Sequence, residues 1–201
     1  MSRDASRDRP SSALPGVRYG SIARFADDRG SFRELWREDA FGPIDPSLAG
    51  APPGEAPRFV QANLSTSAAG VLRGLHLHRR QLDHWVVTTG RAFVALVDIR
   101  PMLAGGPTPR VETRELGEDE WVDIPAGIAH GFLALEPLEL VYLVTNPYDG
   151  NDELGFAWDD VLAAVPWPAI ATSQDGRPIL SERDRSNPTL EGLVDRLRSG
   201  G

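Results

Sequence analysis

Residues 84–100 read HWVVTTGRAFVALVDIR, two strongly apolar runs on either side of Thr89-Gly90. Short runs rich in Val, Phe and Trp and bounded by glycine are typical of buried β-strands. Glycine also adopts the backbone conformations that tight hairpin turns require. We therefore predict a β-hairpin over this segment, with Gly90 relieving the turn, and a core built from strands.

The same pattern continues on both sides of this segment, from Val17 to Asn146. β-type runs are separated by Gly, Pro and Asp, whereas the long apolar stripes of period 3.6 that α/β folds require are missing. Two short helices are expected, over residues 37–42 and 190–200. The nine predicted strands cover residues 17–25, 31–36, 58–65, 71–78, 84–90, 91–100, 113–124, 130–136 and 139–146. This number of short strands favours an all-β sandwich or barrel.

The two ends of the chain differ in composition from this central part. The start, MSRDASRDRPSSALPG, is rich in Ser, Arg, Asp and Pro and cannot bury an apolar face. We expect residues 1–16 to form a flexible N-terminal arm and residues 17–190 to form one domain. Residues 191–201 are expected to form a C-terminal tail with helical character.

The composition excludes several classes of function. The chain has no cysteine, so it can form neither disulfides nor thiolate metal sites. The 29 Asp and Glu residues against 21 Lys and Arg give a formal net charge of −8, which disfavours a nucleic-acid-binding surface. No apolar run approaches the ~18 residues of a membrane span, and the polar start lacks the apolar core of a signal peptide. We expect a cytoplasmic protein that binds neither nucleic acid nor membrane.

The four histidines of the chain gather in two segments. His76 and His78 lie two residues apart in a predicted strand, so their side chains project from one face, which in a barrel can be the interior. The segments GVLRGLHLHRRQLDHWVVTTG and IPAGIAHGF, which add His84 and His130, resemble the two motifs of the cupin superfamily. A single strand histidine is more often structural than catalytic, but four histidines in two such motifs favour a shared pocket.

Over most of its length the sequence resembles the dTDP-4-dehydrorhamnose 3,5-epimerase family, a branch of the cupin-like jelly rolls. The resemblance covers residues 16–190 and rests on several blocks in the family's order. These blocks are DDRGSFRELW, FVQANLSTSAAGVLRGLH, VALVDIR, IPAGIAHGF, VYLVTNPYD, DELGFAWDD, VPWP and ILSERD. The family implies an all-β, cupin-like jelly-roll barrel with short peripheral helices. It also implies a homodimer, a nucleotide-linked (dTDP-type) sugar as substrate, and no metal or other cofactor.

The resemblance also implies roles for individual residues. His76 matches the catalytic base, Asp184 matches the carboxylate that orients this base, and Tyr142 matches the opposing acid. The implied substrate contacts are Arg29, Glu34, Gln61, Asn63, Arg73, His130, Glu153 and Arg183.

These residue types suit the epimerisation of a 4-keto-6-deoxy sugar. A ketone acidifies the C–H groups beside it, so inversion needs a base on one face of the ring, an acid on the other and a donor at the developing enolate. A carboxylate beside the imidazole would fix its tautomer and stabilise the imidazolium. Arg73 and Arg183 offer forked donors for a pyrophosphate. We therefore expect epimerisation at C3, at C5 or at both.

Three positions depart from the family pattern, and all three changes touch the pocket. The family carries a longer loop ending in a lysine that helps hold the enolate oxygen, whereas His84 takes the equivalent place here. His78 replaces the glutamine usually found two residues after the base. An aromatic residue expected near Pro147 is absent, although Tyr148 is adjacent. A protonated His84 is expected to take over the role of the lysine as a substrate contact.

Two other functions stay open at this point. His76, His78, His84 and His130 could instead bind a divalent metal ion, as in other cupins, and a metal-bound His76 could not act as a free base. The chain could also be a catalytically silent sugar-nucleotide-binding module, which is favoured if the base and the acid do not face one another across a cavity. The metal-free epimerase ranks first, because a plain metal cupin does not require the arginine, tyrosine and aspartate of the epimerase set.

Overall fold

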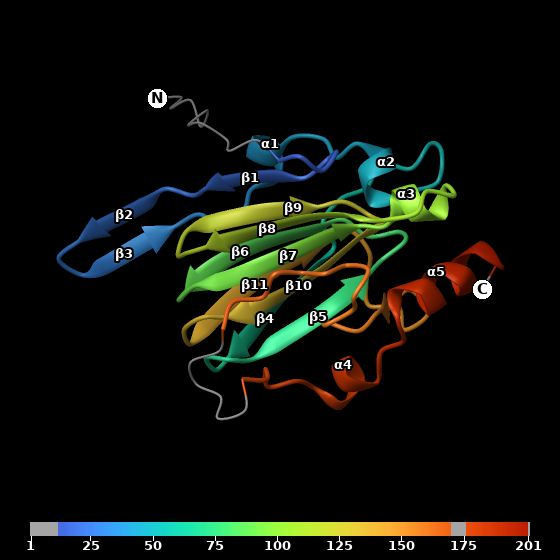
Figure 1. The fold of residues 1–201 in the computed structure, drawn as a ribbon. Coiled ribbons are helices and arrows are strands. Elements are labelled where there is room, and N and C mark those ends of the chain that lie inside the picture. Colours follow the sequence, from blue (N-terminus) through green and yellow to red (C-terminus); the bar gives the residue numbers. More distant parts are fainter. Residues whose placement is uncertain (1–11, 170–175, 201) are drawn as a thin grey trace.

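The computed structural model describes residues 12–169 and 176–200 and contains two five-stranded antiparallel sheets packed face to face (Figure 1). Sheet one consists, in spatial order, of β1 (Arg18–Ser21), β9 (Glu120–Ile124), β6 (Asp83–Thr89), β11 (Leu138–Val144) and β4 (Gln61–Ser67). Sheet two consists of β12 (Leu154–Gly155), β5 (Leu72–Leu77), β10 (Ile128–Ala134), β7 (Ala92–Asp98) and β8 (Arg110–Leu116). This is the all-β, cupin-like jelly roll that the sequence predicts.

Apolar side chains fill most of the space between the two sheets. Trp85 and Val122 of sheet one pack in one buried cluster with Val94, Leu96 and Phe132 of sheet two. Alternation along each strand places these side chains inside and their neighbours outside. Any polar residue that faces inward therefore stands out against an apolar interior.

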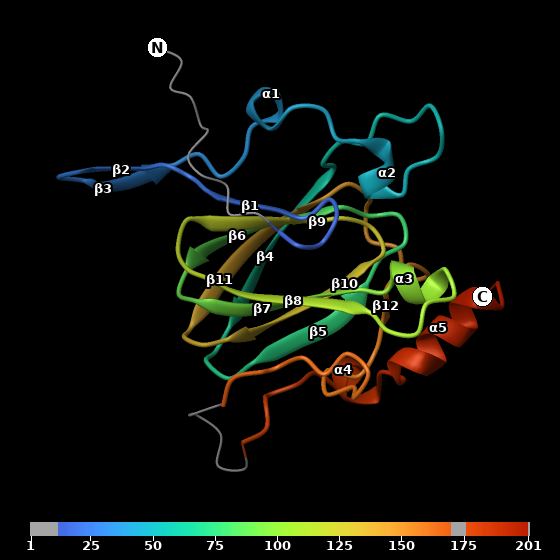
Figure 2. The ribbon, with the colours of Figure 1, turned by 45° about the horizontal axis from the view of Figure 1, so that its top comes forward.

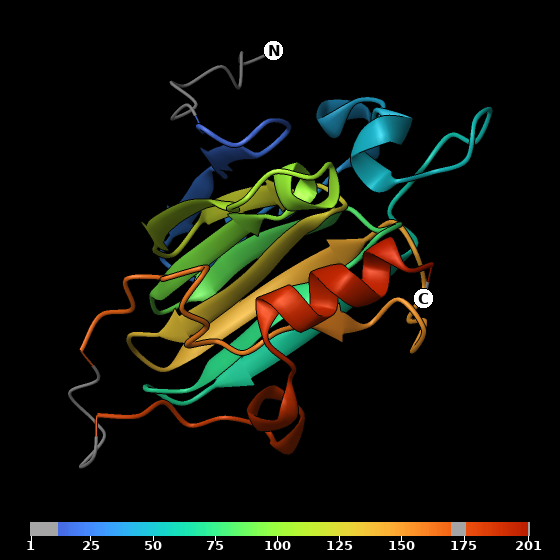
Figure 3. The same ribbon diagram turned by 45° about the vertical axis from the view of Figure 1, so that its right-hand side comes forward.

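A second apolar cluster covers the outer face of sheet two. The C-terminal helix α5 (Leu190–Arg198) lies across this face and buries Leu190, Leu193 and Val194 close to Leu77 of β5 (Figure 3). The C-terminal segment is thus packed against the sheets. The other helices of the described residues are short: α1 (Glu38–Phe41), α2 (Pro46–Ala49), α3 (Arg100–Leu103) and α4 (Glu182–Ser186).

The prediction of a β-hairpin over residues 84–100 is wrong, because the two strands do not pair with each other. β6 pairs with β9 and β11 in sheet one, whereas β7 pairs with β8 and β10 in sheet two. Gly90 does lie in the bend between them with a φ of 80°, and a Cβ there would meet the carbonyl oxygen of Pro137 at 2.1 Å. The turn is therefore correctly placed, but the chain crosses there from one sheet to the other.

Two of the nine predicted strands are divided in the structure. Residues 17–25 divide between β1 and β2 (Arg24–Asp27). Residues 113–124 hold the end of β8 and all of β9, which belong to different sheets. Asp119 has a φ of 69° in the turn between them, so this polar turn ends one strand and starts the next.

The strands β2 and β3 (Gly30–Arg33) form a separate hairpin that projects beyond the two sheets (Figure 2). Its base is anchored, because Arg24 and Arg33 both donate hydrogen bonds to the Asp119 carboxylate in the β8–β9 turn. Beyond this base, the hairpin has no further strand partner in the described part of the chain.

The predicted N-terminal arm falls largely outside the described residues, which exclude residues 1–11. Its last part belongs to the fold, because Leu14 is buried in the cluster between the sheets. No helix in residues 12–169 or 176–200 has the length and apolar character needed to cross a bilayer.

Candidate active site

A cavity of about 260 Å³ opens between the two sheets. Strands of both sheets contribute to its wall, so it interrupts the apolar interior with polar groups. The predicted site residues that line it are Arg73, His76, His130, Tyr142, Glu153 and Arg183.

His76 and Asp184 form a close polar pair at this cavity. His76 lies on β5, and α4 holds Asp184 beside it, with Nε2 of His76 2.7 Å from Oδ1 of Asp184. Ser181 caps α4 and donates from its hydroxyl to the other carboxylate oxygen at 2.8 Å. An ionised carboxylate only accepts, so Nε2 carries the proton and Nδ1 is left as the nitrogen that can take one.

The surroundings of Asp184 keep its carboxyl group ionised. Burial, which leaves the residue 4% exposed, would by itself raise the pKa. The hydrogen bond and charge of His76, the Ser181 hydroxyl and the charge of Arg183 outweigh burial and lower the pKa below its ordinary value. A negative charge is therefore fixed behind His76, where it stabilises an imidazolium.

Arg73 and His76 both face the cavity, although they lie an odd number of residues apart on β5. A register shift between β5 and β10 interrupts the alternation, with His76 opposite His130 and Arg73 opposite Phe132. The Arg73 guanidinium donates to Oγ of Ser67 at 3.1 Å, which holds it beside β4. The irregular strand therefore brings a cation and a base to one wall.

Tyr142 reaches the same cavity from sheet one, on β11. Burial raises the pKa of its phenol, and the negative charges of Asp83 and Glu153 raise it further against the opposing effect of Arg73. The phenol is therefore protonated at neutral pH and can donate to a group inside the cavity.

Three buried side chains, His78, Asp83 and His130, come together at this cavity. Their nitrogen and carboxylate oxygen atoms lie within 4.8 Å of one another. Burial lowers the pKa of His130 to about 4, even though the negative charge of Asp83 opposes this shift. His130 is therefore neutral at working pH and its ring can accept as well as donate.

Glu153 and Arg183 line the cavity and form an ion pair with each other. Gln61 and Asn63 lie next to the cavity, because Gln61 is hydrogen-bonded both to Asn63 and to Tyr148, and Tyr148 lines the cavity. The Gln61 amide donates to Oδ1 of Asn63 at 2.9 Å and accepts from the backbone N–H of Tyr148 at 3.2 Å. These four predicted substrate contacts therefore lie at the cavity or next to it. Each already has a hydrogen-bond or ion-pair partner, which a ligand would have to replace.

His84 does not reach the cavity, which corrects the prediction that it replaces the lysine. Asp83 and Trp85 on either side of it face the cavity, so alternation along β6 turns His84 to the opposite face. There its Nδ1 lies 2.6 Å from Oδ1 of Asp123. The aromatic rings packed around it are those of Phe41, Phe59 and Trp121. The predicted cluster of four histidines is therefore not formed.

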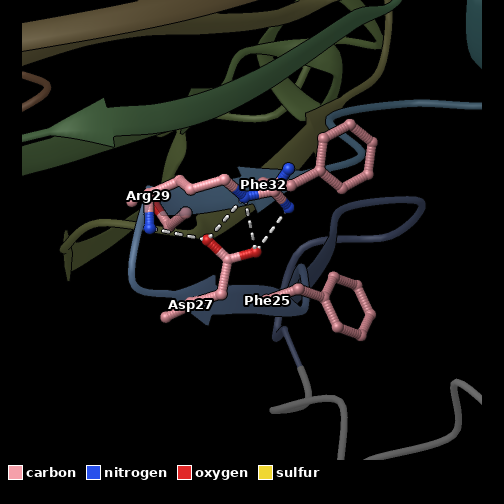
Figure 4. Close-up of a pocket in the computed structure, with 7 residues that line it drawn as sticks. Phe25, Asp27, Arg29 and Phe32 are labelled. Carbon is pink, nitrogen blue, oxygen red and sulfur yellow. Dashed lines mark hydrogen bonds and ion pairs between the residues drawn. The ribbon is translucent and has the colours of Figure 1, made fainter.

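Arg29 and Glu34 also lie apart from the cavity of their own chain. The side chain of Arg29, at the end of the β2–β3 hairpin, is 90% exposed and donates to the Asp27 carboxylate (Figure 4). The same hairpin carries a shallow hollow of about 320 Å³, beside Phe25 and Phe32. Glu34 follows β3 and is half exposed. The fold of the single chain therefore does not bring these two predicted substrate contacts to the cavity wall.

Sequence reasoning missed Asp83 and Trp85 as cavity residues. The pattern that could have placed them is the alternation along β6. Val86 and Val87 are both fully buried, however, so the strand is apolar on both faces and the sequence does not show which face is the interior. The other cavity residues not predicted from the sequence include Ser65, Gln81, Phe132 and Leu140.

Several known proteins similar to this chain are dTDP-4-dehydrorhamnose 3,5-epimerases. The family model described as dTDP-4-dehydrorhamnose 3,5-epimerase matches residues 11–192. The dTDP-4-dehydrorhamnose 3,5-epimerase of Pseudomonas aeruginosa is 39% identical over 181 residues, which cover 86% of this chain and 90% of that protein.

Two solved structures show the same similarity in three dimensions. The rmlC epimerase of Mycobacterium tuberculosis superposes with a TM-score of 0.75 at 30% identity, covering 97% of this chain and 92% of that one. The 3,5-epimerase RmlC of Legionella pneumophila, in complex with dTDP-4-keto-L-rhamnose, superposes with a TM-score of 0.74 at 27% identity, covering 94% and 96%. Sequence, fold and family model agree, and the chain belongs to the dTDP-4-dehydrorhamnose 3,5-epimerase family.

Proposed function

We propose that this chain epimerises a dTDP-linked 4-keto-6-deoxy sugar at C3, at C5 or at both. Nδ1 of His76 takes the proton from a carbon beside the C4 ketone, and the electrons of the broken C–H bond form the double bond of an enolate. Asp184 stabilises the resulting imidazolium. Tyr142 returns a proton to the opposite face of the same carbon, so the configuration inverts while the composition of the sugar is unchanged.

The observation that carries this proposal is the placement of the base and the acid on opposite sheets. His76 lies on β5 of sheet two and Tyr142 on β11 of sheet one, and both line one cavity. A sugar ring held between the sheets would present one face to each. A silent binding module would not need a proton acceptor and a proton donor on opposing walls.

The size and charge of the cavity suit a sugar nucleotide. Its volume of about 260 Å³ is close to the lower end of small-molecule pockets, roughly 300 Å³. It would hold the sugar ring, while the nucleotide extends past Tyr148, which is 73% exposed. Arg73 and Arg183 offer forked donors for the pyrophosphate, with Arg183 exchanging Glu153 for a phosphate oxygen.

The same proposal includes a homodimer in which the β2–β3 hairpin of one protomer lies against the cavity of its partner. Arg29 and Glu34 match substrate contacts of the family, yet they lie away from their own cavity. Phe25 and Phe32 are opposite one another in the hairpin and are 59% and 68% exposed. A projecting hairpin with a paired aromatic surface is typical of an interaction site. A second copy would cover the rings and bring Arg29 to a substrate.

Mixing two inactive variants tests this arrangement. Arg29→Ala removes the contact from the hairpin and His76→Ala removes the base, so each homodimer should be strongly impaired. In a re-associated equal mixture, one cavity of every heterodimer holds both native residues, and random pairing should restore about one quarter of the native activity. A mixture that recovers no activity, or a monomeric mass in light scattering at micromolar concentration, would argue against the dimer.

Proton exchange tests the reaction itself. Incubation with a dTDP-linked 4-keto-6-deoxy sugar in deuterated water should place deuterium at C3, at C5 or at both. The label, located by NMR, reports proton exchange even when the equilibrium hides net conversion. A sugar recovered without deuterium at either carbon would reject the proposed reaction.

A further inference from the structure

We propose that His78, Asp83 and His130 bind a divalent transition-metal ion in the cavity, where the ion holds the C4 ketone oxygen of the substrate. The three residues are only 7%, 2% and 4% exposed. Their ligand atoms lie within 4.8 Å of one another, and small side-chain rotations would close them on an ion at ~2.0–2.2 Å. Two imidazoles and one carboxylate suit ions such as Fe²⁺, Co²⁺ or Zn²⁺.

The two imidazoles are already oriented as metal ligands. Nδ1 of His78 lies 3.0 Å from the carbonyl oxygen of Asp152, and Nδ1 of His130 lies 3.0 Å from that of Ile128. A carbonyl oxygen only accepts, so Nδ1 donates and the neutral ring presents a lone pair on Nε2. Metal-bound histidines are usually supported by this kind of bond from the other ring nitrogen.

The atoms that face the space between these residues are acceptors. Nε2 of His78 lies 4.0 Å from Oε1 of Glu153. In the described part of the chain, the Asp83 carboxylate receives one hydrogen bond, from the Gln81 amide at 3.1 Å. A buried carboxylate is costly unless it is paired or coordinates a metal. A cation between the three side chains would accept lone pairs from Nε2 of His78, Nε2 of His130 and the Asp83 carboxylate.

This set of ligands differs from the four-histidine cluster considered from the sequence. Asp83 faces the cavity in place of His84, and His76 is left out because its Nε2 already donates to Asp184. The base therefore keeps Nδ1 for proton transfer while the ion occupies a neighbouring position. Metal binding and proton abstraction by His76 are compatible in this geometry.

The charge of Asp83 explains why an ion is needed at this wall. The role of the ion, though not its binding, rests on the proposed function. Proton abstraction beside the ketone places negative charge on the C4 oxygen, which an ionised Asp83 would destabilise. A divalent ion bound to this carboxylate leaves a net charge of about +1 and acts as a Lewis acid toward the oxygen.

Metal binding can be measured without substrate. Protein purified without a histidine tag is stripped with chelator and titrated with Co²⁺, whose visible absorption reports its ligands. The native protein should bind one equivalent, and Asp83→Asn and His78→Gln should each bind more than about 100-fold more weakly. His84→Gln is the matched control, since it removes the adjacent histidine on the other face of β6, and it should bind as the native protein does.

Circular dichroism shows which of these variants keep the sheet fold, and two ligand variants are included so that at least one folded protein can be compared. The site is overturned if the native protein binds no Co²⁺, or if the folded ligand variants bind it as tightly as the native protein.

Deuterium exchange then tests the role of the ion. The stripped native protein should exchange at least about tenfold more slowly and recover when Co²⁺ is added. The double variant His78→Gln/Asp83→Lys places an ammonium group where the ion would be. Its rate of deuterium exchange into the sugar should therefore be the same with and without chelator. Full exchange by the stripped native protein would overturn the role of the ion and leave the epimerase proposal standing. Binding of Co²⁺ with no exchange in any state would instead reject the epimerase proposal.

Discussion

Two histidine–carboxylate pairs of nearly equal length occupy very different places in the molecule. Nε2 of His76 lies 2.7 Å from Asp184, and Nδ1 of His84 lies 2.6 Å from Asp123. The His76 side chain is 25% exposed at the cavity wall, whereas that of His84 is 4% exposed among aromatic rings. A histidine–carboxylate pair alone therefore does not make a catalytic site. The strand face on which the ring lies decides what it can touch.

The two carboxylates differ in origin as well. Asp123 is the cross-strand neighbour of His84 and also forms an ion pair with Arg18 at 2.9 Å, so it is a local contact of sheet one. Asp184 comes from a separate helix, 108 residues further along the chain than His76. The first pair belongs to the packing of a sheet, whereas the second is assembled from distant segments at a cavity.

Removal of the cavity-facing base should give the largest effect. His76→Ala should lower turnover by about 10²- to 10⁴-fold, because general-base catalysis contributes in this range. His76 belongs to neither apolar cluster, and the Asp184 carboxylate keeps its hydrogen bond from Ser181, so the thermal unfolding midpoint should fall less than it does in His84→Ala. Turnover within a few-fold of the native rate would exclude His76 as the base.

Loss of the charge behind the base should have a smaller effect on the same step. Asp184→Asn keeps the shape of the side chain but no longer stabilises the imidazolium, so kcat should fall by at least about tenfold. KM should change little, since Asp184 does not line the cavity. Steady-state kinetics separates the two parameters, and a rise in KM with unchanged kcat would contradict the positioning role.

Disruption of the His84–Asp123 pair should lower the free energy of unfolding and leave turnover almost unchanged. His84→Ala opens a buried space beside Asp123 and should lower the free energy of unfolding by about 2–3 kcal/mol. Arg18 still pairs with Asp123, which limits the loss. Urea denaturation gives the stability, and turnover per folded molecule should stay within about threefold of the native value. A variant with native stability and strongly reduced turnover would reverse the roles of the two pairs.

The pH dependence of stability should show the smallest effect. The folded-state pKa of Asp184 is lowered, so its carboxylate stabilises the fold above the unfolded pKa of ~3.9. This contribution is lost as the pH falls through the still lower folded-state pKa. Urea denaturation should therefore show a constant stability difference between native protein and Asp184→Asn near neutral pH, shrinking below about pH 4. A stability difference between the two proteins that grows as the pH falls below about 4 would mean that the folded-state pKa of Asp184 is raised and not lowered.

The sequence identified the cavity through His76 and His78, because residues two apart in a strand share a face and the motif placed both beside a barrel interior. The turn at Gly90 also followed from local chemistry. The same reasoning could not show that β6 and β7 belong to different sheets, since strand partners in a jelly roll are set by long-range topology. His84 was misplaced because β6 is buried on both faces, which hides the direction of alternation.

Asp184 and the hairpin mark another limit of sequence reasoning. Nothing near Asp184 indicates that it meets His76, and its role came from the family resemblance. The alternation of apolar and polar residues along the strands likewise does not indicate that the β2–β3 hairpin projects beyond the two sheets. Contacts between distant segments, and between molecules, require a structure or a known relative.

In the proposed reaction, a base on sheet two and an acid on sheet one act on opposite faces of one sugar ring. Deuterium exchange by Tyr142→Phe tests it most directly, because the ring is kept and only the phenolic hydroxyl is lost. His76 can still remove a proton and return a deuteron to its own face. We expect deuterium in sugar of unchanged configuration, at C3, at C5 or at both, with inversion slowed by at least about 100-fold. Inversion at the native rate would exclude Tyr142 as the proton donor.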